Sequence, residues 1–115
     1  MSSEPTIQVL MPVFNADKYL KVAIESIQNQ SFLDWELLIL DDGSTDNSLK
    51  IIKAMAIKDT RIIWRARENR GLVHTLNELV TWSTSPFLAR MDADDISLVL
   101  RLEHQLNLLE EADLD

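Results

Sequence analysis

Short apolar segments alternate along the chain with longer stretches whose apolar residues recur at helical spacing, and this alternation constrains the fold more than any other feature. Each short segment is apolar enough for a strand that is buried on both faces, and each longer stretch has one apolar helix face. The predicted strands are residues 7–13, 35–40, 62–64 and 87–91, and the predicted helices are 18–30, the stretch from Leu49 to Ala56, 72–82 and 99–111. This order predicts an α/β fold, with a mostly parallel sheet and helices on its faces.

Length and composition are those of one globular domain, which we take as residues 1–115. Apolar residues make up 46% and charged residues 26% of the chain, so we expect a buried core rather than disorder. Cysteine is absent, which excludes disulfides, cysteine-ligated zinc, iron–sulfur clusters and thiol catalysis. Because Gly43 and Gly71 are the only glycines, the chain cannot build the glycine-rich loop of a dinucleotide-dependent dehydrogenase.

The formal net charge of −8 restricts the partners of the chain. A protein this acidic repels phosphate backbones, so we do not expect a nucleic-acid partner. The longest apolar stretch, Val9 to Phe14, is much shorter than the ~20 residues that span a bilayer, and residues 1–6 lack the pattern of a secretory signal. We therefore expect no transmembrane segment, and a cytoplasmic protein that is either free or located at the cytosolic face of a membrane.

Acidic residues follow two of the predicted strands where those strands end. Asp41 and Asp42 follow the second strand, and Asp92, Asp94 and Asp95 follow the fourth. The carboxyl ends of parallel strands meet at one edge of the sheet, where α/β proteins bind ligands. Two carboxylates ~4 Å apart repel by about 4 kcal/mol at an effective dielectric constant of 20, and a divalent cation would remove that cost. Oxygen ligands without histidine or cysteine favour Mg²⁺ or Mn²⁺, so we expect one of these cations.

Each of these motifs also has a simpler interpretation. The acidic pair can belong to a turn, with Ser44 or Thr45 capping the helix that follows. Asn15 or Asp17 can cap the first helix in the same way. Arg70 can bind a phosphate or pair with a neighbouring carboxylate. From the residues alone, both interpretations stay open.

Motifs that extend over nearly the whole chain resemble those of family 2 glycosyltransferases. They are residues 9–15 (VLMPVFN), 26–32 (SIQNQSF), 35–46 (WELLILDDGSTD), 69–77 (NRGLVHTLN) and 89–95 (ARMDADD), in the order and spacing of the family. The resemblance implies a truncated GT-A fold, namely its amino-terminal nucleotide-binding half, which is a Rossmann-like three-layer α/β/α unit. It also implies an inverting enzyme that uses Mg²⁺ or Mn²⁺ to transfer a sugar from a UDP-, dTDP- or GDP-sugar to a hydroxyl of a glycan, lipid or small-molecule acceptor.

The same resemblance implies roles for individual residues. The donor nucleotide would be bound by Pro12, Phe14, Asn15, Asp41, Asp42, Arg70, Asp92 and Asp94. Pro12 and Phe14 would border the base, and Asp42 would contact the base or the ribose. Asp92 and Asp94 would be the metal ligands, with Asp94 at the cation between the phosphates. The cation would stabilise negative charge on the leaving diphosphate.

Two features bear on whether the chain acts alone. Family domains continue past this length, and their later segment supplies the general base and most of the acceptor site. We therefore assign no catalytic base here and expect the chain to be incomplete for catalysis. In addition, Leu100 and Leu108 lie off the main apolar stripe of the last predicted helix, which predicts a further neighbour. The alternative hypothesis is a non-catalytic nucleotide-binding or assembly module of the same fold, with the last helix as its interface to a partner. Exposed apolar surface on this helix could also drive self-association.

Overall fold

The computed structural model describes residues 5–113 of the chain, and side chains for residues 5–108. Strands and helices alternate in the order β1 (Ile7–Val13), α1 (Leu20–Gln28), β2 (Trp35–Asp42), α2 (Ser48–Lys58), β3 (Ile62–Arg67), α3 (Leu72–Trp82), β4 (Phe87–Arg90) and α4 (Arg101–Asp113). The strands form one sheet in the order β3-β2-β1-β4, and all neighbouring strands run parallel. The α/β fold predicted from the alternation is therefore confirmed.

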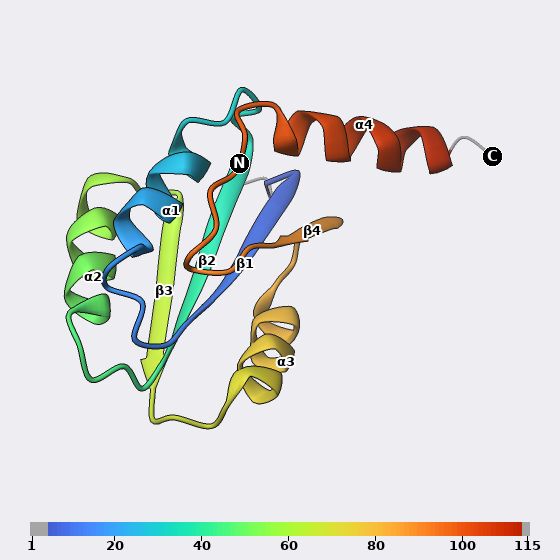
Figure 1. Ribbon diagram of the computed structural model, residues 1–115. Coiled ribbons are helices and arrows are strands. Elements are labelled where there is room, and N and C mark those ends of the chain that lie inside the picture. Colours follow the sequence, from blue (N-terminus) through green and yellow to red (C-terminus); the bar gives the residue numbers. More distant parts are fainter. Residues whose placement is uncertain (1–4, 114–115) are drawn as a thin grey trace.

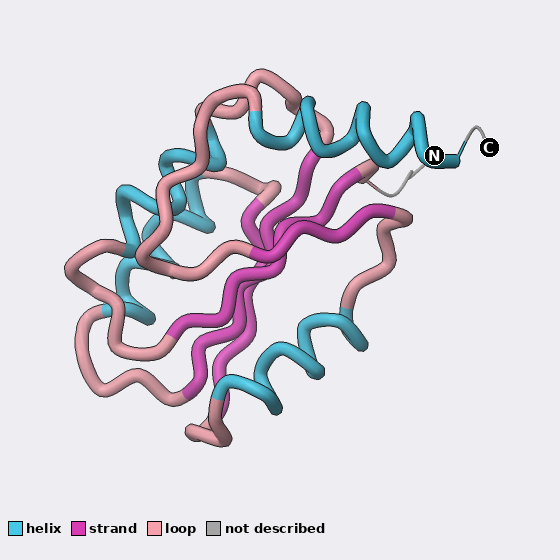
Figure 2. The backbone as a smooth tube through the Cα atoms, turned by 45° about the vertical axis from the view of Figure 1, so that its right-hand side comes forward, coloured by secondary structure: helices cyan, strands magenta, loops and turns pink. Residues whose placement is uncertain are grey.

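Helices cover both faces of this sheet, as Figures 1 and 2 show. Helices α1 and α2 and the start of α4 lie on one face, and α3 lies on the other. Alternate residues of the central strands point to the two layers: Val9 and Met11 pack with the α1 side, whereas Leu10 packs with Leu79 of α3. Because β1 and β2 are buried on both faces, they read as nearly continuous apolar runs in the sequence. Within residues 5–113, none of the helices is long and apolar enough to cross a membrane.

The order in which the strands are added to the sheet reverses at the neighbouring strands β1 and β4. Strands β1, β2 and β3 follow one another toward one edge, and α3 then crosses the opposite face to place β4 beside β1 (Figure 2). Strand β4 pairs with β1 only as far as Leu10, whereas β1 continues beside β2 to Val13. In open α/β sheets, such a switch point at the carboxyl ends of the strands is where ligands bind.

The start of α4 differs from the prediction, because the helix begins at Arg101 and not at Val99. The side chain of Gln30, which is buried beyond the end of α1, explains the difference. Its Nε2 donates to the carbonyl of Leu98 at 2.7 Å, and its Oε1 accepts from the amide of Leu102 at 3.1 Å. These bonds hold the backbone before Arg101 and satisfy one of the free amides of the first helical turn. The predicted apolar residue Leu109 lies outside the described side chains.

The predicted helix caps were wrong. Tyr19 stands at the start of α1 and Asn47 at the start of α2, and neither side chain makes a capping hydrogen bond. Asn15 instead accepts a hydrogen bond from the amide of Thr45 at 2.8 Å, and Asp17 accepts one from the amide of Asn47 at 3.2 Å. The side chains expected to cap α1 therefore join the β1–α1 loop to the β2–α2 loop, at the carboxyl edge of the sheet.

Candidate functional site

Two neighbouring cavities open at the carboxyl edge of the sheet, and both are lined by Pro12, Phe14 and Leu72. The smaller cavity has a volume of about 190 Å³, and its other lining residues are Val13, Asp42, Asn69, Gly71 and Thr75. The larger cavity has a volume of about 340 Å³, and its other lining residues are Asn15, Ala16, Tyr19, Arg90, Asp92, Ala93 and Asp94. Carboxylates from β2 and from the segment after β4 therefore lie at adjoining cavities.

Asp42, the last residue of β2, accepts four hydrogen bonds from the end of β3 and from the segment that follows it. Its Oδ1 accepts from the amide of Arg70 at 2.8 Å and from the guanidinium of Arg67. Its Oδ2 accepts from the amide of Gly71 at 3.0 Å and from Nδ2 of Asn69 at 3.1 Å. A carboxylate offers about four acceptor positions, so the protein itself occupies all of them. Asp42 therefore organises the wall of the smaller cavity.

The same contacts determine the ionisation of Asp42. Burial raises the pKa of this carboxyl, but the hydrogen bonds from the amides of Arg70 and Gly71 and from the Arg67 guanidinium together lower it by more. The pKa of Asp42 therefore lies below its ordinary value of 3.8. Asp42 is therefore a carboxylate at neutral pH, with its negative charge balanced by the Arg67 guanidinium.

Gly43 lets the β2–α2 loop approach this wall closely. Its φ of +76° lies in the left-handed region, and a Cβ at this position would lie 2.5 Å from the backbone nitrogen of Asn69. No other residue type fits there without displacing one of the two loops. Gly43 therefore keeps the turn after β2 in contact with the segment after β3, whose residues donate hydrogen bonds to Asp42.

Asp41 has a different role from its neighbour. It is buried, and its two carboxylate oxygens accept from the hydroxyl of Ser44 at 2.6 Å and from the amide of Ser44 at 3.1 Å. The Ser44 hydroxyl in turn accepts from the amide of Asn15 at 2.9 Å. Neither of the two cavities is lined by Asp41. Asp41 and Ser44 thus shape the turn, and Ser44 does not cap α2 as one interpretation of the sequence expected.

The acidic residues after β4 form a cluster that fits a hard cation. One oxygen each of Asp92, Asp94 and Asp95 lies within 4.8 Å of the others. Asp95 accepts from the amide of Asp92 at 3.1 Å, and Asp92 pairs with Arg90 at 3.1 Å. Asp94 and Asp95 are exposed to solvent. An all-carboxylate group of this kind offers the oxygen ligands that Mg²⁺ and Mn²⁺ take, so the residues present fit the expected cation.

Apolar side chains form the boundary that the two cavities share. Phe14 is 51% exposed and Leu72 is 53% exposed, so the faces of both side chains are open to a ligand. Arg70, in contrast, directs its side chain to Glu68, with a 2.9 Å ion pair, and lines neither cavity. Of the two interpretations of Arg70, the described structure shows the pairing with a carboxylate.

Arg67, Asn69 and Thr75 belong to this site, although none of them was among the predicted donor-binding residues. Arg67 is the partner of Asp42 in the parallel pairing of β2 with β3. The prediction ended the third strand at residue 64, so Arg67 fell in an expected loop. The signal that could have found it is an arginine at the sixth position of a strand whose neighbour ends in two aspartates.

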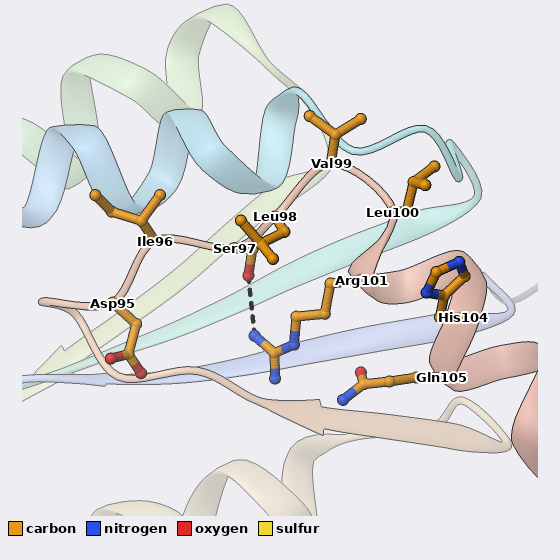
Figure 3. A pocket seen from close by; sticks show the side chains of 9 residues that line it. All are labelled: Asp95, Ile96, Ser97, Leu98, Val99, Leu100, Arg101, His104 and Gln105. Atoms are coloured by element: carbon orange, nitrogen blue, oxygen red, sulfur yellow. Dashed lines mark hydrogen bonds between the residues drawn. The ribbon is translucent and has the colours of Figure 1, made fainter.

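A third cavity, of about 770 Å³, lies between the segment before α4 and the start of that helix (Figure 3). Its lining is mostly apolar, with Ile96, Leu98, Val99 and Leu100 contributing exposed side chains. Nη1 of Arg101 donates to the hydroxyl of Ser97 at 2.9 Å across it (Figure 3). This cavity shares only Asp95 with the acidic cluster, so its chemistry differs from that of the other two.

Known proteins with similar sequences are glycosyltransferases. The family model for glycosyl transferase family 2 matches residues 8–115. The putative glycosyltransferase EpsE of Bacillus subtilis is 38% identical over 112 residues, which are 96% of this chain and 40% of EpsE. The O-antigen biosynthesis glycosyltransferase WbnJ of Escherichia coli is 38% identical over 110 residues, which are 95% of this chain and 43% of WbnJ. The chain thus spans about two fifths of the length of these relatives.

Solved structures with the same fold include complexes with nucleotides or nucleotide sugars. The 1–349 fragment of S. aureus TarS, in a complex with UDP, superposes with a TM-score of 0.84 at 24% identity over 92% of this chain and 32% of that fragment. The mannosyltransferase PcManGT of Pyrobaculum calidifontis, in a complex with GDP-Man and Mn²⁺, superposes with a TM-score of 0.74 at 22% identity, over 83% of this chain and 29% of that protein. The fold is therefore that of GT-A transferases, and the chain belongs to glycosyl transferase family 2.

Proposed function

We propose that this chain is the donor-binding part of an inverting glycosyltransferase, which transfers a sugar from a nucleotide diphosphate sugar to a hydroxyl of a glycan, lipid or small-molecule acceptor. One observation carries the proposal beyond family membership. An acidic cluster that fits a divalent cation lies at a cavity that adjoins, across Phe14 and Leu72, the cavity of Asp42. A nucleoside diphosphate has the matching two-ended chemistry, with a flat base at one end and phosphates that need a cation at the other.

The residues of the chain divide this binding between them. Pro12, Phe14 and Leu72 would contact the base and keep water from it, because they form the apolar boundary of both cavities. Asp42 would fix the wall beside the base and, if a ligand N–H displaced one of its four donors, would contact the base or ribose directly. Asp41 and Asn15 would hold the loops around the donor through Ser44 and Thr45.

Asp94 and Asp92, with Asp95 beside them, would hold Mg²⁺ or Mn²⁺. When bound, such a cation would stabilise the negative charge on the leaving diphosphate. Arg90 pairs with Asp92 and so limits the repulsion within the cluster while leaving Asp94 and Asp95 exposed. We propose no role in donor contact for the side chain of Arg70 while it is paired with Glu68.

Calorimetric titration of the chain with UDP, dTDP and GDP, with and without Mn²⁺, tests the proposal. We expect Mn²⁺ to increase the affinity for at least one of the three, and we expect Asp94→Asn to abolish that increase. Glu103→Gln, which removes one exposed carboxylate on α4, is the matched control and should leave the titration unchanged. Equal affinities of the Asp94→Asn variant and the unaltered chain for a nucleotide in the presence of Mn²⁺ would be evidence against the metal site.

The second candidate is a non-catalytic assembly module that associates with itself. The exposed apolar side chains before α4 favour it, because Ile96 is 68% and Leu98 is 80% exposed, and clustered apolar exposure marks interaction surfaces. Leu108 adds a further exposed leucine on α4 itself. Sedimentation over a range of chain concentrations separates the candidates: a monomer at every concentration would exclude self-association through this surface.

A further inference from the structure

We propose that Arg67 is a positioning residue for nucleotide binding: its guanidinium fixes Asp42 and, with it, residues 68–71, of which Asn69 and Gly71 line the smaller cavity. The inference rests on the proposed function, because it concerns how the wall beside the base is held. Arg67 itself lines neither of the two cavities at the carboxyl edge, so any effect on a ligand must pass through its neighbours.

The position of Arg67 follows from the register of the sheet. It is the last residue of β3, directly opposite Asp42 in the parallel pairing, and its side chain is only 13% exposed. A buried guanidinium must have its N–H donors satisfied and its charge balanced. Both needs are met by groups from three different elements of the fold.

Four hydrogen bonds fix the orientation of the guanidinium. Its Nη1 donates to Oδ1 of Asp42 and to the carbonyl of Glu68, the latter at 3.0 Å. Its Nε donates to Oε1 of Glu78 on α3 at 2.8 Å, and its Nη2 donates to the hydroxyl of Thr75 at 3.1 Å. Because the guanidinium is planar and its donors form a rigid fork, these partners define a single orientation.

The same network controls both ends of the cavity wall. Thr75 is fully buried and lines the smaller cavity, and its hydroxyl donates to the carbonyl of Gly71 at 2.8 Å while it accepts from Arg67. Arg67 therefore holds the first residue of the segment 68–71 directly, through the Glu68 carbonyl, and its last residue, Gly71, through Thr75. Without Arg67, the Asp42 and Glu78 carboxylates would lose the cation between them, and the wall would lose contacts at both ends.

The experiment measures nucleotide affinity in variants of the network. The chain and its variants are titrated with UDP, dTDP and GDP in the presence and in the absence of Mn²⁺, at a temperature where circular dichroism shows each variant to be folded. We expect Arg67→Met to weaken the affinity about tenfold, as expected when a hydrogen-bonded charge is lost, and Arg67→Lys to restore part of it because the cation beside Asp42 is kept. The ratio of affinities with and without Mn²⁺ should not change, because the acidic cluster is untouched.

Two further variants separate positioning from stability. Glu78→Gln removes the negative charge that α3 presents to Arg67 without touching Asp42 or a cavity, and it should weaken the affinity in the same direction by a smaller factor. If Arg67→Met does not fold, Glu78→Gln still tests the positioning role of Arg67. Arg61→Met, the control, removes an arginine that pairs with Asp59 at the opposite end of β3, and should leave the affinity unchanged.

The outcomes distinguish this inference from the proposed function. If the unaltered chain binds none of the three nucleotides, the proposed function is wrong and the inference is overturned with it. If the unaltered chain binds a nucleotide and the folded Arg67→Met and Glu78→Gln variants bind it equally tightly, only the inference is overturned. If Arg61→Met weakens the affinity as much as Arg67→Met does, the effect is general destabilisation, and the inference is again overturned.

Discussion

Asp41 and Asp42 are adjacent buried aspartates, and the same substitution should have very different effects at the two positions. They are 2% and 4% exposed, so burial alone predicts similar consequences for replacement by asparagine. Their partners differ, however. Asp42 accepts hydrogen bonds from four separate donors, whereas Asp41 accepts both of its hydrogen bonds from Ser44. Asparagine keeps the shape of the side chain, but it replaces one acceptor oxygen with a donating NH₂ group.

At position 42, the NH₂ group would face two donors whichever way the amide is turned. Two hydrogen bonds are lost, and Arg67 keeps only Glu78 to balance its charge. Removing one partner of a buried ion pair costs about 3–5 kcal/mol, and we expect Asp42→Asn to lower the free energy of unfolding by an amount in this range. At position 41, the amide can accept from the Ser44 amide and donate to the Ser44 hydroxyl, so the cost should be about 1 kcal/mol.

Urea unfolding followed by tryptophan fluorescence measures the difference, with the midpoints compared at a common slope. The Asp42→Asn midpoint should fall well below that of Asp41→Asn. Changes within about 1 kcal/mol of each other would refute the argument that the four donors around Asp42 stabilise the fold, since ~1 kcal/mol is the typical net value of a single hydrogen bond.

The stability difference between the unaltered chain and Asp42→Asn should depend on pH with a definite sign. The pKa of Asp42 in the folded chain lies below its ordinary value of 3.8, so its stabilising effect is complete above pH 3.8 and is lost as the pH falls through the folded pKa. The stability difference between the unaltered chain and Asp42→Asn should therefore be constant near neutral pH and decrease below pH 3.8.

Two other substitutions test the contacts around the site. Gly43→Ala should lower the free energy of unfolding by about 2–5 kcal/mol, because it adds both strain in a left-handed backbone conformation and a forced contact with Asn69. Gly71→Ala should cost only the backbone strain, about 1–3 kcal/mol, because its Cβ would meet nothing within 4 Å. Urea unfolding measures both, and a Gly43→Ala variant as stable as the unaltered chain would contradict the close loop contact. Gln30→Ala removes the partner of the Leu102 amide, so hydrogen exchange at this amide should become faster; unchanged exchange would show that Gln30 does not hold the start of α4.

The central part of the fold was predictable because both faces of β1 and β2 are covered. Strands buried on both faces must be apolar at nearly every position, and this leaves a signal that does not depend on register. The predicted first strand, 7–13, coincides with β1, and the predicted second strand falls short of the end of β2 only by the two aspartates. Helix α3 coincides with its prediction because its apolar residues keep helical spacing from Leu72 to Val80.

Edge strand β3 was harder to predict, and the error had consequences for the site. Residues 65 and 66 are exposed, so the apolar pattern stops at Trp64 although backbone pairing continues to Arg67. Sequence periodicity reports burial and not pairing, so it cannot detect an exposed continuation of a strand. The same reason explains the missed role of Gln30, whose partners Leu98 and Leu102 are 68 and 72 residues away along the chain.

The two acidic groups at the carboxyl edge therefore differ in electrostatic character, although they look alike in sequence. Asp42 is balanced within the protein by Arg67 and by backbone amides, so it is stable without a ligand. Among the side chains of residues 5–108, the cluster after β4 has one ion pair, between Arg90 and Asp92, so three carboxylates and one arginine leave a charge of −2. A divalent cation has the charge that cancels this excess. In the proposed function, a chain of net charge −8 would repel a bare diphosphate and hold one that binds together with the cation.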